Sequence, residues 1–213
     1  MQKVRAMKPD LLLASGDLSE DGSRVSYQRL QGIFAPLDIP VLALPGNHDD
    51  PGLLAMTFPG SPTDSMEVTE HGPWQIIRLN SCLPGKPEGL LDESTLMDLE
   101  EHLRDRGQRP CMLALHHQPI NIGGPWIDKY PLLQPQAILK IIDDHTSIKA
   151  VTWGHVHQAF ELYRNGTVML GGPSSSINSL PGSQKFTPDP AGPSCRWIEL
   201  GVNGALQTGI VYV

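Results

Sequence analysis

Four short polar clusters, each placed directly after a run of apolar residues, constrain the fold of this chain more than any other feature. They are Gly16-Asp17, Gly46-Asn47-His48-Asp49, His116-His117 and Gly154-His155-Val156-His157. Short apolar runs without alternation are typical of strands that are buried on both faces of a parallel sheet. The carboxyl ends of such strands meet where ligands bind. The pattern therefore predicts an α/β fold with carboxylate, amide and imidazole groups gathered at one end of a sheet.

The segments between the clusters alternate between helical and extended patterns. Ser23 is a suitable N-cap for a helix that leads to a second buried strand over 41–44, which predicts a parallel strand–helix–strand unit. Helices are also predicted at about 53–58, over 92–104 and from Pro135 onward, and hairpins at 66–79 and around Asn165-Gly166. The C-terminal third is expected to be antiparallel, with a long ordered loop over 171–192.

Composition bounds the class of protein. The 213 residues show no linker that would divide them, so a single domain over 1–213 is expected. The net charge of -7 and the lack of a Lys/Arg cluster argue against a nucleic-acid partner. No apolar stretch approaches the length that spans a membrane, and the first five residues lack the apolar core of a secretion signal. A cytoplasmic protein without a membrane partner is therefore expected.

Each polar cluster taken alone has an ordinary structural explanation. An Asp after a strand, such as Asp17, is more often a turn residue or a helix cap than a ligand, and a His-x-His pair is common by chance. Four clusters in this order, each after its own apolar run, favour a metal site that binds an anionic substrate. His48 has the character of a general acid. Of His116 and His117, one is expected to be a ligand and the other a supporting donor.

These clusters resemble the motifs of the calcineurin-like metallophosphoesterases. The segments Leu79-Asn80-Ser81, Pro84-Gly85, Gly172-Pro173-Ser174 and Gln184-Lys185-Phe186 resemble, more narrowly, the bacterial class III cyclic-nucleotide phosphodiesterases. The resemblance covers nearly the whole chain. It implies a two-sheet β-sandwich flanked by helices, in the layer order helix, sheet, sheet, helix (αββα).

The resemblance also implies a centre with two divalent ions, Fe²⁺ or Mn²⁺ and also Zn²⁺. Its metal ligands would be Asp17, as the bridge, with Asn47, His116 and His155 on one ion and His157 on the other. Asn47 and His117 would contact the substrate, and Glu20 or Asp21 would orient the catalytic acid His48. A metal-bound hydroxide would attack 3′,5′-cyclic AMP, a small-molecule partner, and His48 would protonate the leaving oxygen to give the 5′-monophosphate.

The chain departs from the family pattern at its start. Family members begin with a strand that ends in Asp-x-His and supplies two further metal ligands, and residues 1–10 contain no such motif. The expectation is an N-terminally truncated domain whose first strand is missing, with an incomplete second metal site. The open sheet edge would favour self-association, for example as a homodimer. The alternatives are an inactive binding or scaffold module with this fold, and a phosphoesterase that acts on another phosphate ester.

Overall fold

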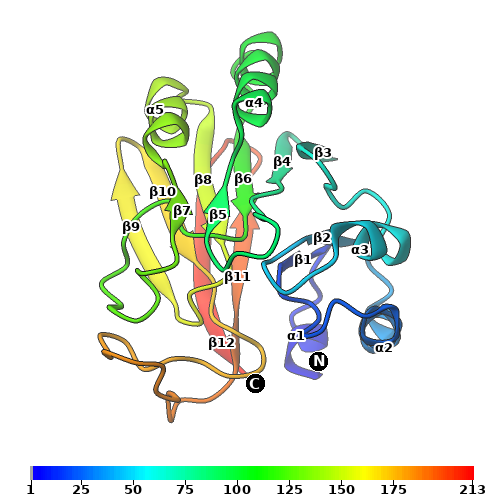
Figure 1. The fold of residues 1–213 in the computed structure, drawn as a ribbon. Helices are drawn as coiled ribbons and strands as arrows, with labels where there is room; N and C mark the ends of the chain where they lie inside the picture. Colours follow the sequence, from blue (N-terminus) through cyan, green and yellow to red (C-terminus); the bar gives the residue numbers. More distant parts are fainter. Residues whose placement is uncertain (1) are drawn as a thin grey trace.

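The apolar runs of the sequence form a six-stranded sheet in the computed structural model, which describes residues 2–213. The strand order is β3 (Met66–His71), β4 (Trp74–Leu79), β6 (Cys111–Leu115), β8 (Ile148–Trp153), β10 (Thr167–Gly171) and β9 (Phe160–Arg164). The four inner strands are parallel to one another, and the two edge strands are antiparallel to their neighbours. The carboxyl ends of β4, β6, β8 and β10 therefore lie at one end of the sheet (Figure 1).

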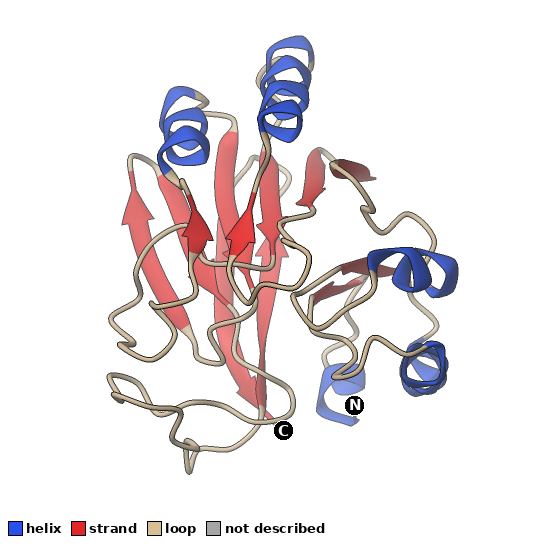
Figure 2. Ribbon diagram, viewed as in Figure 1, coloured by secondary structure: helices blue, strands red, loops and turns tan. Residues whose placement is uncertain are grey.

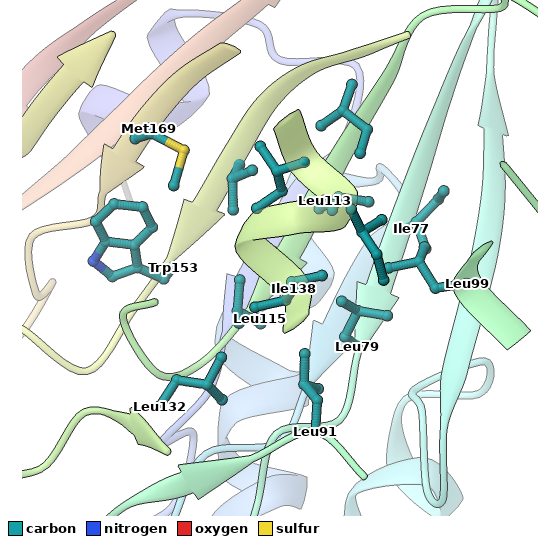
Figure 3. Close-up of a cluster of buried hydrophobic side chains, with 14 of the residues drawn as sticks. Ile77, Leu79, Leu91, Leu99, Leu113, Leu115, Leu132, Ile138, Trp153 and Met169 are labelled. Atoms are coloured by element: carbon teal, nitrogen blue, oxygen red, sulfur yellow. The ribbon is translucent and has the colours of Figure 1, made fainter. Parts of the chain in front are cut away.

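One face of this sheet is covered by α4 (Glu93–Asp105) and α5 (Gln136–Asp144). Alternate residues of the inner strands, among them Ile77, Leu113 and Trp153, pack against Leu99 and Ile138 of these helices (Figure 3). The residues between them in sequence point to the opposite face, as the two-residue period of a strand requires. The sheet is thus apolar on both faces, which explains its continuous apolar runs.

The opposite face carries a second layer of strands. The parallel pair β1 (Leu12–Ser15) and β2 (Val41–Leu44) and the antiparallel pair β11 (Ser194–Leu200) and β12 (Leu206–Tyr212) form separate two-stranded sheets. Both pairs pack on the same apolar cluster, which is centred on Trp74, Ile76, Met112 and Ala150. Among residues 2–213, β1 is paired on one side only, by β2.

Two helices cover the outside of the β1–β2 pair. They are α2 (Arg24–Phe34) and α3 (Pro51–Thr57). Tyr27 and Leu54 of these helices, with Phe58 directly after α3, are buried against Ala14 and Ala43. The layers therefore run helix, sheet, sheet, helix, which confirms the predicted architecture (Figure 2). The remaining short elements are α1 (Gln2–Ala6), the 3₁₀ turn η1 (Ala35–Leu37) and the parallel pair β5 (Gly89–Leu90) and β7 (Leu132–Leu133). No helix within 2–213 has both the length and the apolar character needed to cross a bilayer.

Local signals in the sequence set several element boundaries correctly. Ser23 and Asp92 cap α2 and α4 as N-cap residues. The antiparallel pairs predicted for the C-terminal third are present as β9–β10 and β11–β12, but β10 also pairs in parallel with β8, which was not predicted. The hairpin at Asn165-Gly166 places the fully buried β10 inside the sheet and the more polar β9 at its edge. Because the more apolar strand of the hairpin is the one that is buried, β10 and not β9 lies beside β8, and β10 runs parallel to it.

Candidate metal centre

The fold brings all four polar clusters to one place. Asp17 follows β1, Asn47 follows β2, His116 follows β6, and His155 follows β8. The first two strands belong to one sheet and the last two to the other, so the clusters meet where the carboxyl ends of both sheets converge. Direct contacts link the sheets here, since His116 Nε2 lies 3.3 Å from Asp17 Oδ2 and His116 Nδ1 lies 2.8 Å from the Ser15 carbonyl.

Gly46 is required by the close approach of these chains. A Cβ atom at this position would lie 2.2 Å from Asp17 Oδ1 and 2.8 Å from His116 Cε1. Both distances are far below van der Waals contact, so any larger residue would displace the carboxylate or the ring. The glycine therefore allows the loop after β2 to close onto the site.

Three of the predicted ligands have a backbone conformation that side chains disfavour. Asp17, His155 and His157 have φ angles of 53°, 59° and 52°, in the left-handed region. Non-glycine residues rarely adopt this region, and such strain is concentrated at functional sites. The fold therefore retains an unfavourable backbone at three of the residues that were predicted to bind metal.

Backbone carbonyls fix the tautomers of three imidazoles. His116 Nδ1, His155 Nε2 and His157 Nδ1 lie 2.8, 3.0 and 2.9 Å from the carbonyl oxygens of Ser15, Tyr130 and Ile177. A carbonyl oxygen can only accept, so each of these ring nitrogens carries the proton and donates it. In the neutral ring, the other nitrogen is left with a free lone pair. This arrangement is the one that orients histidine ligands around metal ions.

Unsatisfied acceptor atoms in the site test whether a cation fits. Asn47 Oδ1 and His116 Nε2 are both buried and have no hydrogen-bond partner. His116 Nε2 also faces the Asp17 carboxylate at 3.3 Å, so a neutral His116 ring sets two lone pairs against each other. A proton or a metal ion between them relieves this repulsion. Amide oxygen, carboxylate and neutral imidazole are all ligands for divalent first-row metals, so the residues fit such an ion.

The charges of Asp17 and His116 depend on each other. Burial alone would raise the pKa of Asp17, but the neighbouring His116 and the backbone N–H of His48 hold the pKa of this carboxyl well below its usual value. Burial likewise opposes a charge on His116, and the negative charge of Asp17 outweighs it and raises the pKa of that imidazole. The site therefore favours a fixed negative charge at Asp17, which attracts a cation.

His117 lies directly behind these ligands and is fully buried. Its Nδ1 atom is 2.8 Å from Ser81 Oγ, and its ring centroid is 4.8 Å from those of both His116 and His155. Burial and the neighbouring imidazoles lower the pKa of His117 to about 2 and that of His155 to about 3. Potential ligand atoms of His116, His117 and His155 lie within 4.8 Å of one another, so both members of the His116-His117 pair reach the site.

Glu20 and Asp21 have different surroundings, although sequence reasoning treated them alike. The half-exposed His48 ring has Nδ1 at 3.7 Å from Glu20 Oε1 and at 3.4 Å from the Glu20 carbonyl. The Asp21 carboxylate instead accepts hydrogen bonds from Ser19, Ser23 and Ser26 at the start of α2. The structure thus brings Glu20 to His48 and uses Asp21 to hold the loop.

Sequence reasoning missed the residue that joins the two metal-site loops. The Asp49 carboxylate accepts hydrogen bonds from the backbone N–H groups of Leu18, Ser19 and Gly46 and from the Tyr27 hydroxyl, at 2.9–3.1 Å. It therefore ties the loop after β1 to the loop after β2. The one sequence feature that pointed to Asp49 was its position in the Gly46–Asp49 cluster. That feature does not distinguish it from an ordinary turn residue, because aspartate is common in turns.

Comparisons with known proteins agree with this architecture. The family pattern described as calcineurin-like phosphoesterase matches residues 1–159. A relative from Pseudomonas aeruginosa, named 3′,5′-cyclic adenosine monophosphate phosphodiesterase CpdA, is 36% identical over 99% of this chain and 78% of its own length. The CpdA of Escherichia coli K12 is 33% identical over 94% of this chain and 74% of its own length.

Solved structures show the same fold at low sequence identity. A dimetal phosphatase from Danio rerio has a TM-score of 0.64 at 15% identity, over 81% of this chain and 74% of that one. The protein TT1561 of Thermus thermophilus has a TM-score of 0.58 at 14% identity, over 97% of this chain and 89% of that one. On the match over 1–159 and the identity to these relatives, this chain belongs to the calcineurin-like phosphoesterase family.

Proposed function

We propose that this chain is a metal-dependent phosphodiesterase that hydrolyses 3′,5′-cyclic AMP to 5′-AMP. Two relatives that are 36% and 33% identical to this chain over most of its length are named for this activity. The observation that carries the proposal is the pair of buried, unsatisfied acceptors, Asn47 Oδ1 and His116 Nε2, beside the Asp17 carboxylate. Burying these acceptor atoms without a cation costs free energy. A cation bound to them would neutralise the carboxylate and could then bind the oxygens of a phosphate ester.

The proposed ligands divide between two ions. Asp17 would be shared, Asn47, His116 and His155 would complete one position, and His157 would contribute to the other. Divalent ions, Fe²⁺ or Mn²⁺ and also Zn²⁺, supply Lewis-acid activation of water and neutralise charge on the phosphoryl oxygens. The full burial of His117 and its contact with Ser81 support a role in holding the ligands in place rather than in contacting substrate.

His48 is the proposed general acid. In the hydrolysis, a water oxygen forms the new bond to phosphorus and the bond from phosphorus to O3′ breaks. The departing O3′ alkoxide is strongly basic, so it requires a proton, which His48 would donate. The exposed ring of His48 lies at the rim of the centre, with its backbone N–H bonded to Asp17 Oδ1 at 3.0 Å. The nearby Glu20 carboxylate would orient the His48 ring.

The test is hydrolysis of cyclic AMP by the purified chain with Mn²⁺ or Fe²⁺ added, with separation of 5′-AMP from 3′-AMP. We expect 5′-AMP alone, and loss of both turnover and bound metal in His155→Ala. The matched control is His71→Ala, because His71 lies at the far end of the sheet beside Trp74. Bound metal without turnover of any phosphodiester would refute the proposal and favour a scaffold with this fold. Turnover of other esters but not of cyclic nucleotides would refute the substrate alone.

A further inference from the structure

The long loop between β10 and β11 is attached to the metal centre itself. His157 Nδ1 donates to the Ile177 carbonyl, and the His157 carbonyl accepts from Ser179 N at 2.8 Å. The buried Asn178 side chain bonds Ser174 N, the Gly192 carbonyl and Ser194 Oγ, and so ties the two ends of the loop together. Figure 1 shows the loop, in orange, along the lower end of the sheet. This segment therefore has a defined position beside the site.

An aromatic ring from this loop lies next to a proposed metal ligand. The ring centroid of Phe186 is 6.2 Å from that of His157 and 5.3 Å from that of Trp126, and both contacts are edge-to-face. Trp126 comes from the segment after His117, in the turn in which Gly124 accepts from Ile127 and Asp128. Two loops thus meet at the rim of the centre through their aromatic side chains.

The side chain of Phe186 contacts other aromatic rings and is also partly exposed to solvent. Contacts with Trp126 and His157 fix the orientation of its ring, yet the residue remains 38% exposed. Ile177 and Leu180 of the same loop are also exposed, at 43% and 41%. Apolar groups gathered at the rim of a site are typical of ligand binding. We define Phe186, backed by Trp126, as the aromatic platform.

We propose that the aromatic platform stacks against the nucleobase of the substrate, which makes Phe186 a specificity-determining residue for cyclic purine nucleotides. This inference rests on the proposed function. A rigid, half-exposed ring fits a flat aromatic ligand, and bases stack on such rings through a face that every base possesses. Stacking grows with ring size, so the platform favours purines over pyrimidines and discriminates little between adenine and guanine.

The test compares binding of 5′-AMP and ribose 5-phosphate to the Mn²⁺-loaded protein by calorimetry, because these ligands share a phosphate and a sugar and differ in the base. In Phe186→Ala we expect the affinity for 5′-AMP to fall about tenfold to about a hundredfold, while that for ribose 5-phosphate changes less than about twofold. Phe186→Tyr should restore 5′-AMP binding. Tyr163→Ala, at an exposed aromatic of β9, is the control.

Two results would overturn the platform. An equal loss for both ligands would mean that Phe186 only supports His157, and no loss for either would mean that the base lies elsewhere. Turnover of cyclic AMP by the wild-type protein, measured on the same samples, separates this inference from the proposed function. If the wild-type protein hydrolyses cyclic AMP, and Phe186→Ala leaves the ratio of the affinities for 5′-AMP and ribose 5-phosphate unchanged, only the platform is refuted. Absence of turnover refutes the function, while the binding ratio still decides whether Phe186 contacts a base.

Discussion

The hydroxyl group of Tyr27 allows a sharp test of how the two metal-site loops are held. Tyr27 is fully buried on α2. Its hydroxyl donates to Asp49 Oδ1 at 3.0 Å and accepts from the backbone N–H of Asp50 at 2.8 Å. The substitution Tyr27→Phe removes both hydrogen bonds and retains the ring that packs against Ala14 and Leu54. The variant therefore isolates the polar contribution of one oxygen atom.

The contacts of the Tyr27 hydroxyl determine how much stability Tyr27→Phe is expected to lose. A hydrogen bond to a charged group contributes about 1.5–3 kcal/mol, and a buried N–H left without an acceptor costs about 1–3 kcal/mol. The Asp50 N–H is only partly buried, so the lower end of that range applies, and Asp49 keeps its three backbone donors. The sum is about 3 kcal/mol, which for a protein of this size lowers the Tm by about 6–12 °C.

The assay is thermal unfolding of the metal-free protein, with urea unfolding as a second measure of stability. Tyr163→Phe is the matched control, because Tyr163 is 71% exposed on β9 and should leave the Tm unchanged. A decrease below about 2 °C in Tyr27→Phe would refute the view that this hydroxyl joins the loops.

Three further predictions concern the site. The variant His48→Ala should reduce kcat for cyclic AMP by about 10²–10⁴-fold and affect a p-nitrophenyl diester far less, because that leaving group needs no proton; equal losses would contradict the acid role. Gly46→Ala should abolish metal binding in a calorimetric titration, because its Cβ would meet Asp17 Oδ1, and retained affinity would show that the loop can shift. The metal-free protein should lose stability as the pH falls from 7 to 5. The pKa values of His117 and His155, about 2 and about 3, lie below that of an unfolded histidine, so the unfolded chain takes up protons first. Over this range the loss in urea unfolding is about 2 kcal/mol for each of these two histidines, partly offset by His116, whose pKa is raised; a flat profile would refute the assigned direction.

The parts of the site that follow strands could be predicted from the sequence. Asp17, Asn47, His116 and His155 each follow an apolar run, and parallel strands bring such positions together whatever the loops do. The helix caps were predictable for a similar reason, since Ser23 and its bonding partner Ser26 are three residues apart. Local chemistry and strand direction therefore account for what the sequence analysis found.

The contacts that were missed join residues far apart in the chain. Tyr27 and Asp49 are 22 residues apart, and Tyr27 fits the apolar face of α2 without its hydroxyl. Phe186 and Trp126 meet only because two loops cross at the same end of the sheet. The parallel pairing of β10 with β8 likewise depends on which strand of a hairpin is buried. None of these contacts leaves a periodic or short-range pattern in the sequence.

The unfavourable features of the centre act together, which links metal binding to folding. Without a cation, the fold retains left-handed backbone at Asp17, His155 and His157. It also leaves Asn47 Oδ1 buried without a hydrogen-bond partner. A divalent ion offsets both costs in the folded state and has no comparable site in the unfolded chain. Binding must therefore raise stability, by about 2.7 kcal/mol at a free metal concentration one hundred times the Kd. On the proposed function, the fold would orient these ligands before the ion arrives, and binding would offset the cost of the strained backbone.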